Sequence, residues 1–213
     1  MISTPNYESL KRLAREKRAK YGVTTEALNL VVVRKIYSEE EIRIDNWKFP
    51  RTIRAAYMSD DSDPSVAINK TLPREPRLFS LIHELKHHYV DRLTIENGQI
   101  RCGDYNENQV IEIGAEVFAA EFIYPEAEFL DRLKCLNIHP GKCTPEDVVR
   151  VKRECEACVS YQFLRKRLVR LGFANALALD GVQFQKLEEQ IYGVPIYKQE
   201  WFRQRRARRA PAR

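Results

Sequence analysis

The segment LFSLIHELKHHYVD, residues 78–91, brings three histidines and a glutamate close together in the chain. His83 and His87 are four residues apart, so on a helix both imidazoles point to the same face. Glu84 lies beside His83, within reach of a water molecule held by a metal ion. In this HExxH arrangement, zinc bound by two histidines and a carboxylate keeps one position open for water. The segment therefore predicts a hydrolytic zinc centre.

The alternative is a helix with ordinary hydrogen-bonded histidines, because a five-letter pattern also occurs by chance. The apolar stretch just before His83 argues against this, since ionisable groups on a buried helix are costly unless something pairs them. A bound metal ion removes that cost. His88 lies on another side of the helix from both ligands, so we expect it to have only a supporting role.

A third ligand is expected on a later helix that buries a carboxylate. Residues 110–124, VIEIGAEVFAAEFIY, are apolar almost all round. Glu112 and Glu116 share a face, whereas Glu121 lies opposite Glu112 and is expected to reach solvent. We predict Glu112 as the third zinc ligand and Glu116 as the acceptor for an imidazole N–H. The alternative is a helix whose glutamates are all simply exposed.

The elements that must position these residues predict an α+β fold, because a run of strands precedes a run of helices. We expect the sheet to be antiparallel and to pack on the HExxH helix and the third-ligand helix. A first helix is expected over residues 6–20. The expected strands cover 29–36, 41–49, 52–59 and 64–71. The later helices are expected over 75–92, 106–124, 126–137, 145–157, 160–171 and 176–191.

Composition favours a folded protein without a membrane segment. The chain is 44% hydrophobic, yet it contains no run of about 18 apolar residues. The charged N-terminal stretch does not resemble a secretory signal, so a cytoplasmic location is expected. We expect a zincin-like peptidase domain over residues 1–140, a helical extension packed on it over 141–195, and a basic tail over 196–213.

The net charge of +6 is concentrated in basic clusters, one of them in a helix-turn-helix-like segment, residues 145–171. Thr144 and Pro145 are predicted to cap its first helix. Its second helix offers basic side chains to phosphates or to an acidic partner. These are Arg165, Lys166, Arg167 and Arg170. The alternative is that this helix only packs on the peptidase domain and carries a solvated basic face.

Two segments, FSLIHELKHHYVD and VIEIGAEVFAAEFIYP, resemble the ImmA/IrrE metallopeptidases. That family's pattern is roughly F-T-x-x-H-E-x-x-H followed by E-x-x-A-N-x-F-A-A-x-L-L-M-P. The segment VSYQFLRKRLVRLGF is also similar to the family's ending, so the resemblance spans roughly residues 50–173. It implies zinc ligation by His83, His87 and Glu112, with Glu84 as the catalytic base.

Two departures from the family pattern bear on the site. Lys86 stands where glycine is common, away from the ligand face, and is expected to affect packing more than chemistry. Glu116 replaces the usual asparagine, which keeps an acceptor and adds a charge.

The resemblance implies a substrate and a biological setting. In the family the substrate is typically a helix-turn-helix repressor encoded nearby. Its cleavage derepresses genes in mobile-element induction, the DNA-damage response or antiviral defence. The CapP branch, which accompanies CBASS defence systems, is also similar, and single-stranded DNA is a candidate activator. The alternative is a peptidase-like module that holds a repressor or DNA without cleaving; the intact Glu84 argues against it.

The five cysteines are expected to be thiols or metal ligands rather than a disulfide framework. Cys102 lies in a polar loop between the two ligand helices, where its thiolate could occupy the open zinc position, as the CapP resemblance suggests. The alternative is an ordinary loop cysteine. The remaining four do not have the spacing of a common zinc finger, and small buried cysteines are the expected reading. They are Cys135, Cys143, Cys155 and Cys158.

Overall fold

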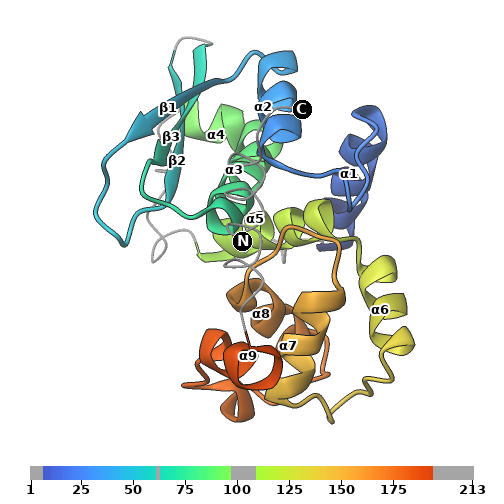
Figure 1. Ribbon diagram of the computed structural model, residues 1–213. Helices are drawn as coiled ribbons and strands as arrows, with labels where there is room; N and C mark the ends of the chain where they lie inside the picture. Colours follow the sequence, from blue (N-terminus) through green and yellow to red (C-terminus); the bar gives the residue numbers. More distant parts are fainter. Residues whose placement is uncertain (1–6, 61–62, 97–108, 194–213) are drawn as a thin grey trace, which may run out of the picture. The chain divides into compact units, whose positions relative to one another are not determined.

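A computed structural model of the protein describes residues 7–60, 63–96 and 109–193 (Figure 1). The chain divides into two compact units. The first runs to Phe129 and also includes Glu156–Ser160, and the second comprises Leu130–Cys155 and the chain from Tyr161 onward. Within the described ranges, none of the helices has both the length and the apolar character needed to span a membrane.

The first unit combines helices with one small sheet, which confirms the predicted α+β class. Its helical elements are α1 (Tyr7–Lys20), α2 (Leu30–Glu39), α3 (Arg74–Lys86), the π-helical turn η1 (His87–Asp91), α4 (Arg92–Glu96) and α5 (Gln109–Ile123). Its strands are β1 (Arg43–Trp47), β2 (Ala55–Asp60) and β3 (Asp63–Asn69). Helix α6 (Glu126–Cys135) spans the boundary to the second unit.

The sheet is mixed, with the order β1-β3-β2. The predicted antiparallel pairing is correct for β2 with β3 and wrong for β1, which runs parallel to β3. The buried side chain of Asn69, the last residue of β3, contacts the loop that connects β1 to β2. Its Nδ2 donates to the carbonyls of Phe49, Pro50 and Ile53, which holds the connecting loop in place.

The expected strand at 29–36 is wrong, because this segment forms helix α2. Asn29 caps the helix, and its Oδ1 accepts from Val31 N at 2.8 Å and from Val32 N at 3.2 Å. The buried residues Val33, Ile36 and Tyr37 follow helical spacing. Consecutive β-branched residues favour a strand, but the cap and the packing of one helical face outweigh that preference.

The core of the first unit lies around α3 and α5, which position the chemistry-bearing residues (Figure 1). Each fully buried leucine or isoleucine stabilises the fold by about 1.5–3 kcal/mol. On α3 these are Leu78, Leu81, Ile82 and Leu85. Helix α1 packs on α5, and Arg15 forms a 2.7 Å ion pair with Glu121, which is only 2% exposed. The expectation that Glu121 reaches solvent is therefore wrong.

The second unit contains α7 (Pro145–Glu154), α8 (Tyr161–Arg170), the 3-10 turn η2 (Leu177–Leu179) and α9 (Phe184–Tyr192). Thr144 caps α7 in a capping box with Asp147, and Pro145 begins the helix, as predicted. The single helix expected over 176–191 is broken, because Gly181 adopts a φ of +68° that ends η2 and separates it from α9.

Candidate metal centre

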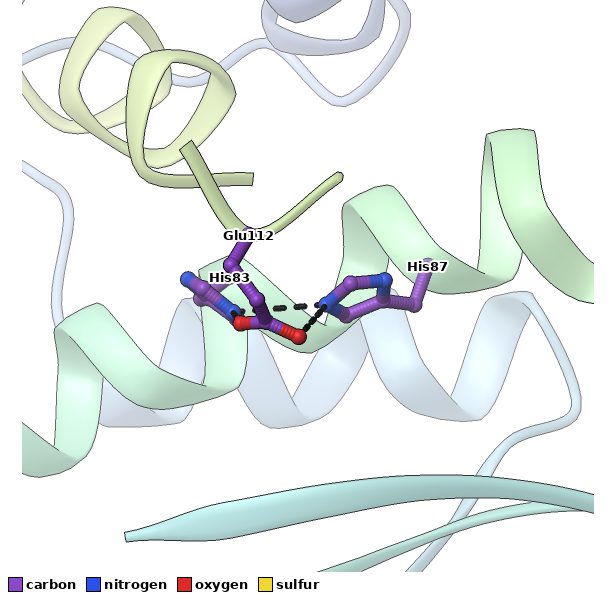
Figure 2. A group of neighbouring side chains, drawn as sticks. All are labelled: His83, His87 and Glu112. Carbon is purple, nitrogen blue, oxygen red and sulfur yellow. Dashed lines mark hydrogen bonds and ion pairs between the residues drawn. The ribbon is translucent and has the colours of Figure 1, made fainter. Parts of the chain in front are cut away.

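Three elements of the first unit supply the candidate ligands. His83 lies in the last turn of α3, whose apolar side chains are buried, and His87 begins the π-helical turn that follows without a break. Glu112 lies in the first turn of α5. Figure 2 shows both imidazoles on one side of their helix, with the Glu112 carboxylate facing them.

The three side chains converge. Nε2 of His83 lies 3.0 Å from Oε2 of Glu112, Nε2 of His87 lies 3.7 Å from Oε1 of Glu112, and the two Nε2 atoms are 3.3 Å apart. One ligand atom from each residue fits within 4.8 Å of the others. A tetrahedral ion about 2.1 Å from its nitrogen and oxygen ligands separates them by roughly 3.4 Å. The observed separations suit such an ion.

One oxygen atom of Glu112 gives an independent test of that fit. Oε1 of Glu112 is buried and has no hydrogen-bond partner, since its 3.7 Å separation from His87 is too long for a hydrogen bond. A buried carboxylate oxygen without a partner is costly, whereas a cation held between it and the imidazoles would satisfy it. The residues present therefore fit a metal ion.

The charges around His83 also favour a cation. Burial alone would lower the pKa of His83, but the Glu112 hydrogen bond and the negative charges of Glu84 and Glu116 raise it overall. Burial would raise the pKa of Glu112, and its contact with His83 lowers it overall. The same negative potential attracts a bound metal ion.

Asp91 supports His87 from the side opposite the ligand cluster. Its Oδ2 atom lies 2.7 Å from Nδ1 of His87, a contact that leaves Nε2 available to a metal. Sequence reasoning missed Asp91, although its position four residues after His87 places it on the same helical face. The sequence predicts such an acceptor role for Glu116, which is half-buried and whose charge acts on His83. That role for Glu116 remains a prediction.

His88 belongs to a separate network. Its Nδ1 lies 3.1 Å from the hydroxyl of Tyr57, and its Nε2 lies 3.8 Å from Oε2 of Glu40. The other oxygen of Glu40 accepts from Lys20 at 2.8 Å and from Tyr89 at 3.3 Å. His88 therefore joins η1 to the sheet and to the end of α2, apart from the ligand group.

Only part of the basic contact surface predicted on α8 is exposed to solvent. Arg165 forms a 2.8 Å ion pair with Asp180. Arg167 is buried and its guanidinium carbon lies 5.7 Å from the centre of the Phe163 ring, which does not suit the predicted contact with DNA or a partner. The exposed members are Lys166 and Arg170.

The cysteines contribute no ligands to this group within the described residues, and Cys102 lies outside them. Cys143 is buried, as expected, and burial raises its pKa to about 12. Cys135 is exposed, so the expectation of burial is wrong for it. Cys155 and Cys158 are half-buried.

Comparisons with known proteins identify a similar fold and a protein family. A solved structure described as a Mycobacterium tuberculosis transcriptional regulator has a similar fold, with a TM-score of 0.53 and 14% identity. The similarity covers 76% of this chain and 46% of that one, so this chain spans less than half of the regulator's length. A comparison with curated proteins finds no match. The peptidase family described as the IrrE N-terminal-like domain matches residues 44–169, which contain the whole candidate metal centre, and the chain belongs to this family.

Proposed function

We propose that the protein is a zinc-dependent endopeptidase that cleaves a helix-turn-helix transcriptional repressor. The observation that carries the catalytic part of the proposal is the convergence of His83, His87 and Glu112 in a chain of a peptidase family. Two imidazoles and one carboxylate form a ligand set that zinc uses in hydrolytic centres.

The proposed chemistry divides between the ion and Glu84. When bound, zinc supplies Lewis-acid polarisation of the peptide carbonyl and lowers the pKa of water. Glu84 is buried beside His83, and its charge raises the pKa of that imidazole, so it lies within electrostatic reach of the centre. It takes a proton from the attacking water, whose oxygen adds to the carbonyl carbon. The C–N bond then breaks, and Glu84 gives the proton to the leaving amine.

The proposed substrate rests on the two motifs that resemble ImmA/IrrE metallopeptidases, for which repressor cleavage is typical. Cleavage would derepress genes in the DNA-damage response, in mobile-element induction or in antiviral defence inside the cytoplasm. Lys166 and Arg170 on α8 offer exposed positive charge for a non-specific contact with DNA. Single-stranded DNA is therefore the activator that we propose to test.

Regulation by Cys102 is a second part of the proposal. Zinc binding favours deprotonation of a thiol, and a thiolate in the fourth position would exclude water from the centre. In this scheme the resting enzyme is inhibited until Cys102 leaves the metal.

The experiment combines the full chain with the helix-turn-helix protein encoded beside it, with and without single-stranded DNA. The wild type is expected to release a discrete fragment, whereas Glu84→Gln is expected to release none while retaining zinc. Chelation of the metal should stop cleavage, and added zinc should restore it. If stoichiometric complexes form but no condition yields a fragment, the second candidate, a non-cleaving binding module, replaces the endopeptidase.

A further inference from the structure

Lys86 is a buried lysine at the end of α3. Lys86 is only 3% exposed. The ammonium donates to Oδ2 of Asp91 at 2.6 Å and to the carbonyl of Ile111 at 3.2 Å. A buried ammonium is costly unless it is paired and hydrogen-bonded, and both conditions are met here. The two partners of Lys86 then show which parts of the molecule it connects.

Both partners of Lys86 are next to proposed metal ligands. The Asp91 oxygen that accepts from Lys86 also lies 2.7 Å from Nδ1 of His87. Ile111 immediately precedes Glu112 at the start of α5. The Lys86 ammonium therefore contacts Asp91, which supports the proposed ligand His87. It also contacts the backbone next to the proposed ligand Glu112 on α5.

The π-helical turn makes the contact between Lys86 and Asp91 possible. Residues five apart on an α-helix point roughly 140° away from each other, so Lys86 and Asp91 would not meet there. The wider turn of a π-helix brings residues five apart to the same side. Because η1 covers His87–Asp91, Asp91 can face both Lys86 and His87.

The end of the Lys86 side chain lies against α5 at Gly114. A Cβ atom at Gly114 would be 3.6 Å from Cε and 3.7 Å from Nζ of Lys86, an ordinary van der Waals separation, and 3.0 Å from Cδ1 of Leu10 on α1. The lysine side chain therefore packs on α5 beside the carbonyl of Ile111, to which it donates.

We propose that Lys86 and Asp91 form a positioning pair for the metal centre. Asp91 accepts from Nδ1–H of His87 and so holds the tautomer whose Nε2 faces the metal. Lys86 holds both the Asp91 carboxylate and the first turn of α5, and thereby sets the separation between His87 and Glu112. This inference rests on the proposed function, because it assigns the pair to the same metal centre.

The test compares Asp91→Asn, Lys86→Met and the double variant with the wild type as full chains. Zinc affinity is measured by competition with a chelator, and stability by denaturant unfolding of the metal-free proteins. Asp91→Asn is expected to weaken zinc binding about 10- to 100-fold, the usual effect of losing a partner behind a histidine ligand. Lys86→Met should weaken it less, because the contact between Asp91 and His87 remains.

The double variant separates positioning from folding. Asp91→Asn leaves the buried Lys86 without its counter-charge, so the metal-free single variant should lose stability. Replacing Lys86 by Met as well removes that buried charge and should restore much of the stability. Zinc affinity should nevertheless stay as low as in Asp91→Asn. Recovery of affinity together with stability would overturn the proposal, because it would make Asp91 a purely structural residue.

A matched control is the exposed pair Asp131 and Lys134, 3.0 Å apart. Asp131→Asn and Lys134→Met should leave zinc affinity unchanged. Unchanged affinity in Asp91→Asn would overturn the positioning pair. A wild type that binds zinc tightly but cleaves nothing would instead overturn the proposed endopeptidase and leave the pair standing. A wild type that binds no zinc would overturn both.

Discussion

The hydroxyl of Tyr37 on α2 donates a 2.6 Å hydrogen bond to the carbonyl oxygen of Leu81 on α3, two residues before His83. Tyr37 is fully buried, and its ring belongs to the core of the first unit. Helix α2 therefore supports the backbone of the helix that carries the candidate metal centre.

Tyr37→Phe should lower the free energy of unfolding by about 1 kcal/mol, because a buried hydrogen bond is lost while the ring remains. The measurement is urea unfolding of the metal-free protein, followed by circular dichroism. Tyr192→Phe, at an exposed position, is the control and should change little. Equal losses in the two variants would mean that the Tyr37 hydroxyl contributes nothing specific.

The roles proposed for the ligands predict a loss of zinc, whereas the role proposed for the base predicts a loss of cleavage activity. His83→Ala and Glu112→Gln should reduce the zinc content of purified protein, because each removes a ligand. Glu84→Gln should keep zinc and lose about 10²- to 10⁴-fold in cleavage rate, the usual contribution of a general base. Elemental analysis beside a cleavage assay makes the comparison. Zinc lost from His83→Ala but retained in Glu112→Gln would exclude Glu112 as the third ligand.

Glu40 predicts a pH dependence of stability. Burial would raise its pKa, but contacts with Lys20, Lys17 and Tyr89 lower it overall from the ordinary value of 4.5. A carboxyl group with a lowered pKa stabilises the fold fully above its unfolded value, and this contribution is lost as pH falls through the folded value. Glu40→Gln should therefore cost about 1–3 kcal/mol at pH 7 and progressively less below about pH 4.5.

The measurement for Glu40 is denaturant unfolding of wild type and variant between pH 3 and pH 7. Glu16→Gln, at an exposed pair with Arg12, serves as the control and should have a small effect throughout. A Glu40→Gln difference that stays constant over the whole range would contradict the lowered pKa.

The cap of α7 predicts a local loss of stability. Thr144→Ala removes the side chain that accepts from Asp147 N and should cost about 1 kcal/mol. Thr144→Ser keeps the hydroxyl and should retain most of the stability. Thermal unfolding of both variants provides the comparison, and identical behaviour would show that the capping box is not needed for α7.

The proposed inhibition by Cys102 predicts a gain of function. Cys102→Ala should cleave the helix-turn-helix substrate without an activating signal, because no thiolate would compete with water for the metal. Cys135→Ala, at an exposed cysteine, is the matched control and should behave as the wild type does. If the resting activity of Cys102→Ala equals that of the wild type, Cys102 is an ordinary cysteine.

Tertiary contacts decided the elements that the sequence described wrongly. The segment around Val33 has strand-forming residues, yet it is a helix because its buried face packs in the core and Asn29 caps its start. Strand β1 is parallel to β3, and the side chain of Asn69 at the end of β3 holds the loop that connects β1 to β2. The core packing of α2 and the contacts of Asn69 cannot be read from spacing, since they join positions that are distant in the chain, whereas the Asn29 cap is a local contact with Val31 and Val32.

The sequence by itself determined which residues converge at the candidate metal centre. The four-residue spacing of His83 and His87 places both on one face of any helix, and the apolar surroundings of Glu112 indicated that its carboxylate is buried for a reason. Only the tertiary structure decided which residues support these ligands. The contact of Lys86 with Asp91 depends on a local π-helical turn, and its contact with Ile111 depends on how closely α5 approaches α3. Helical periodicity in the sequence shows which residues share one face of a helix. Which residues that face contacts is set by packing between elements.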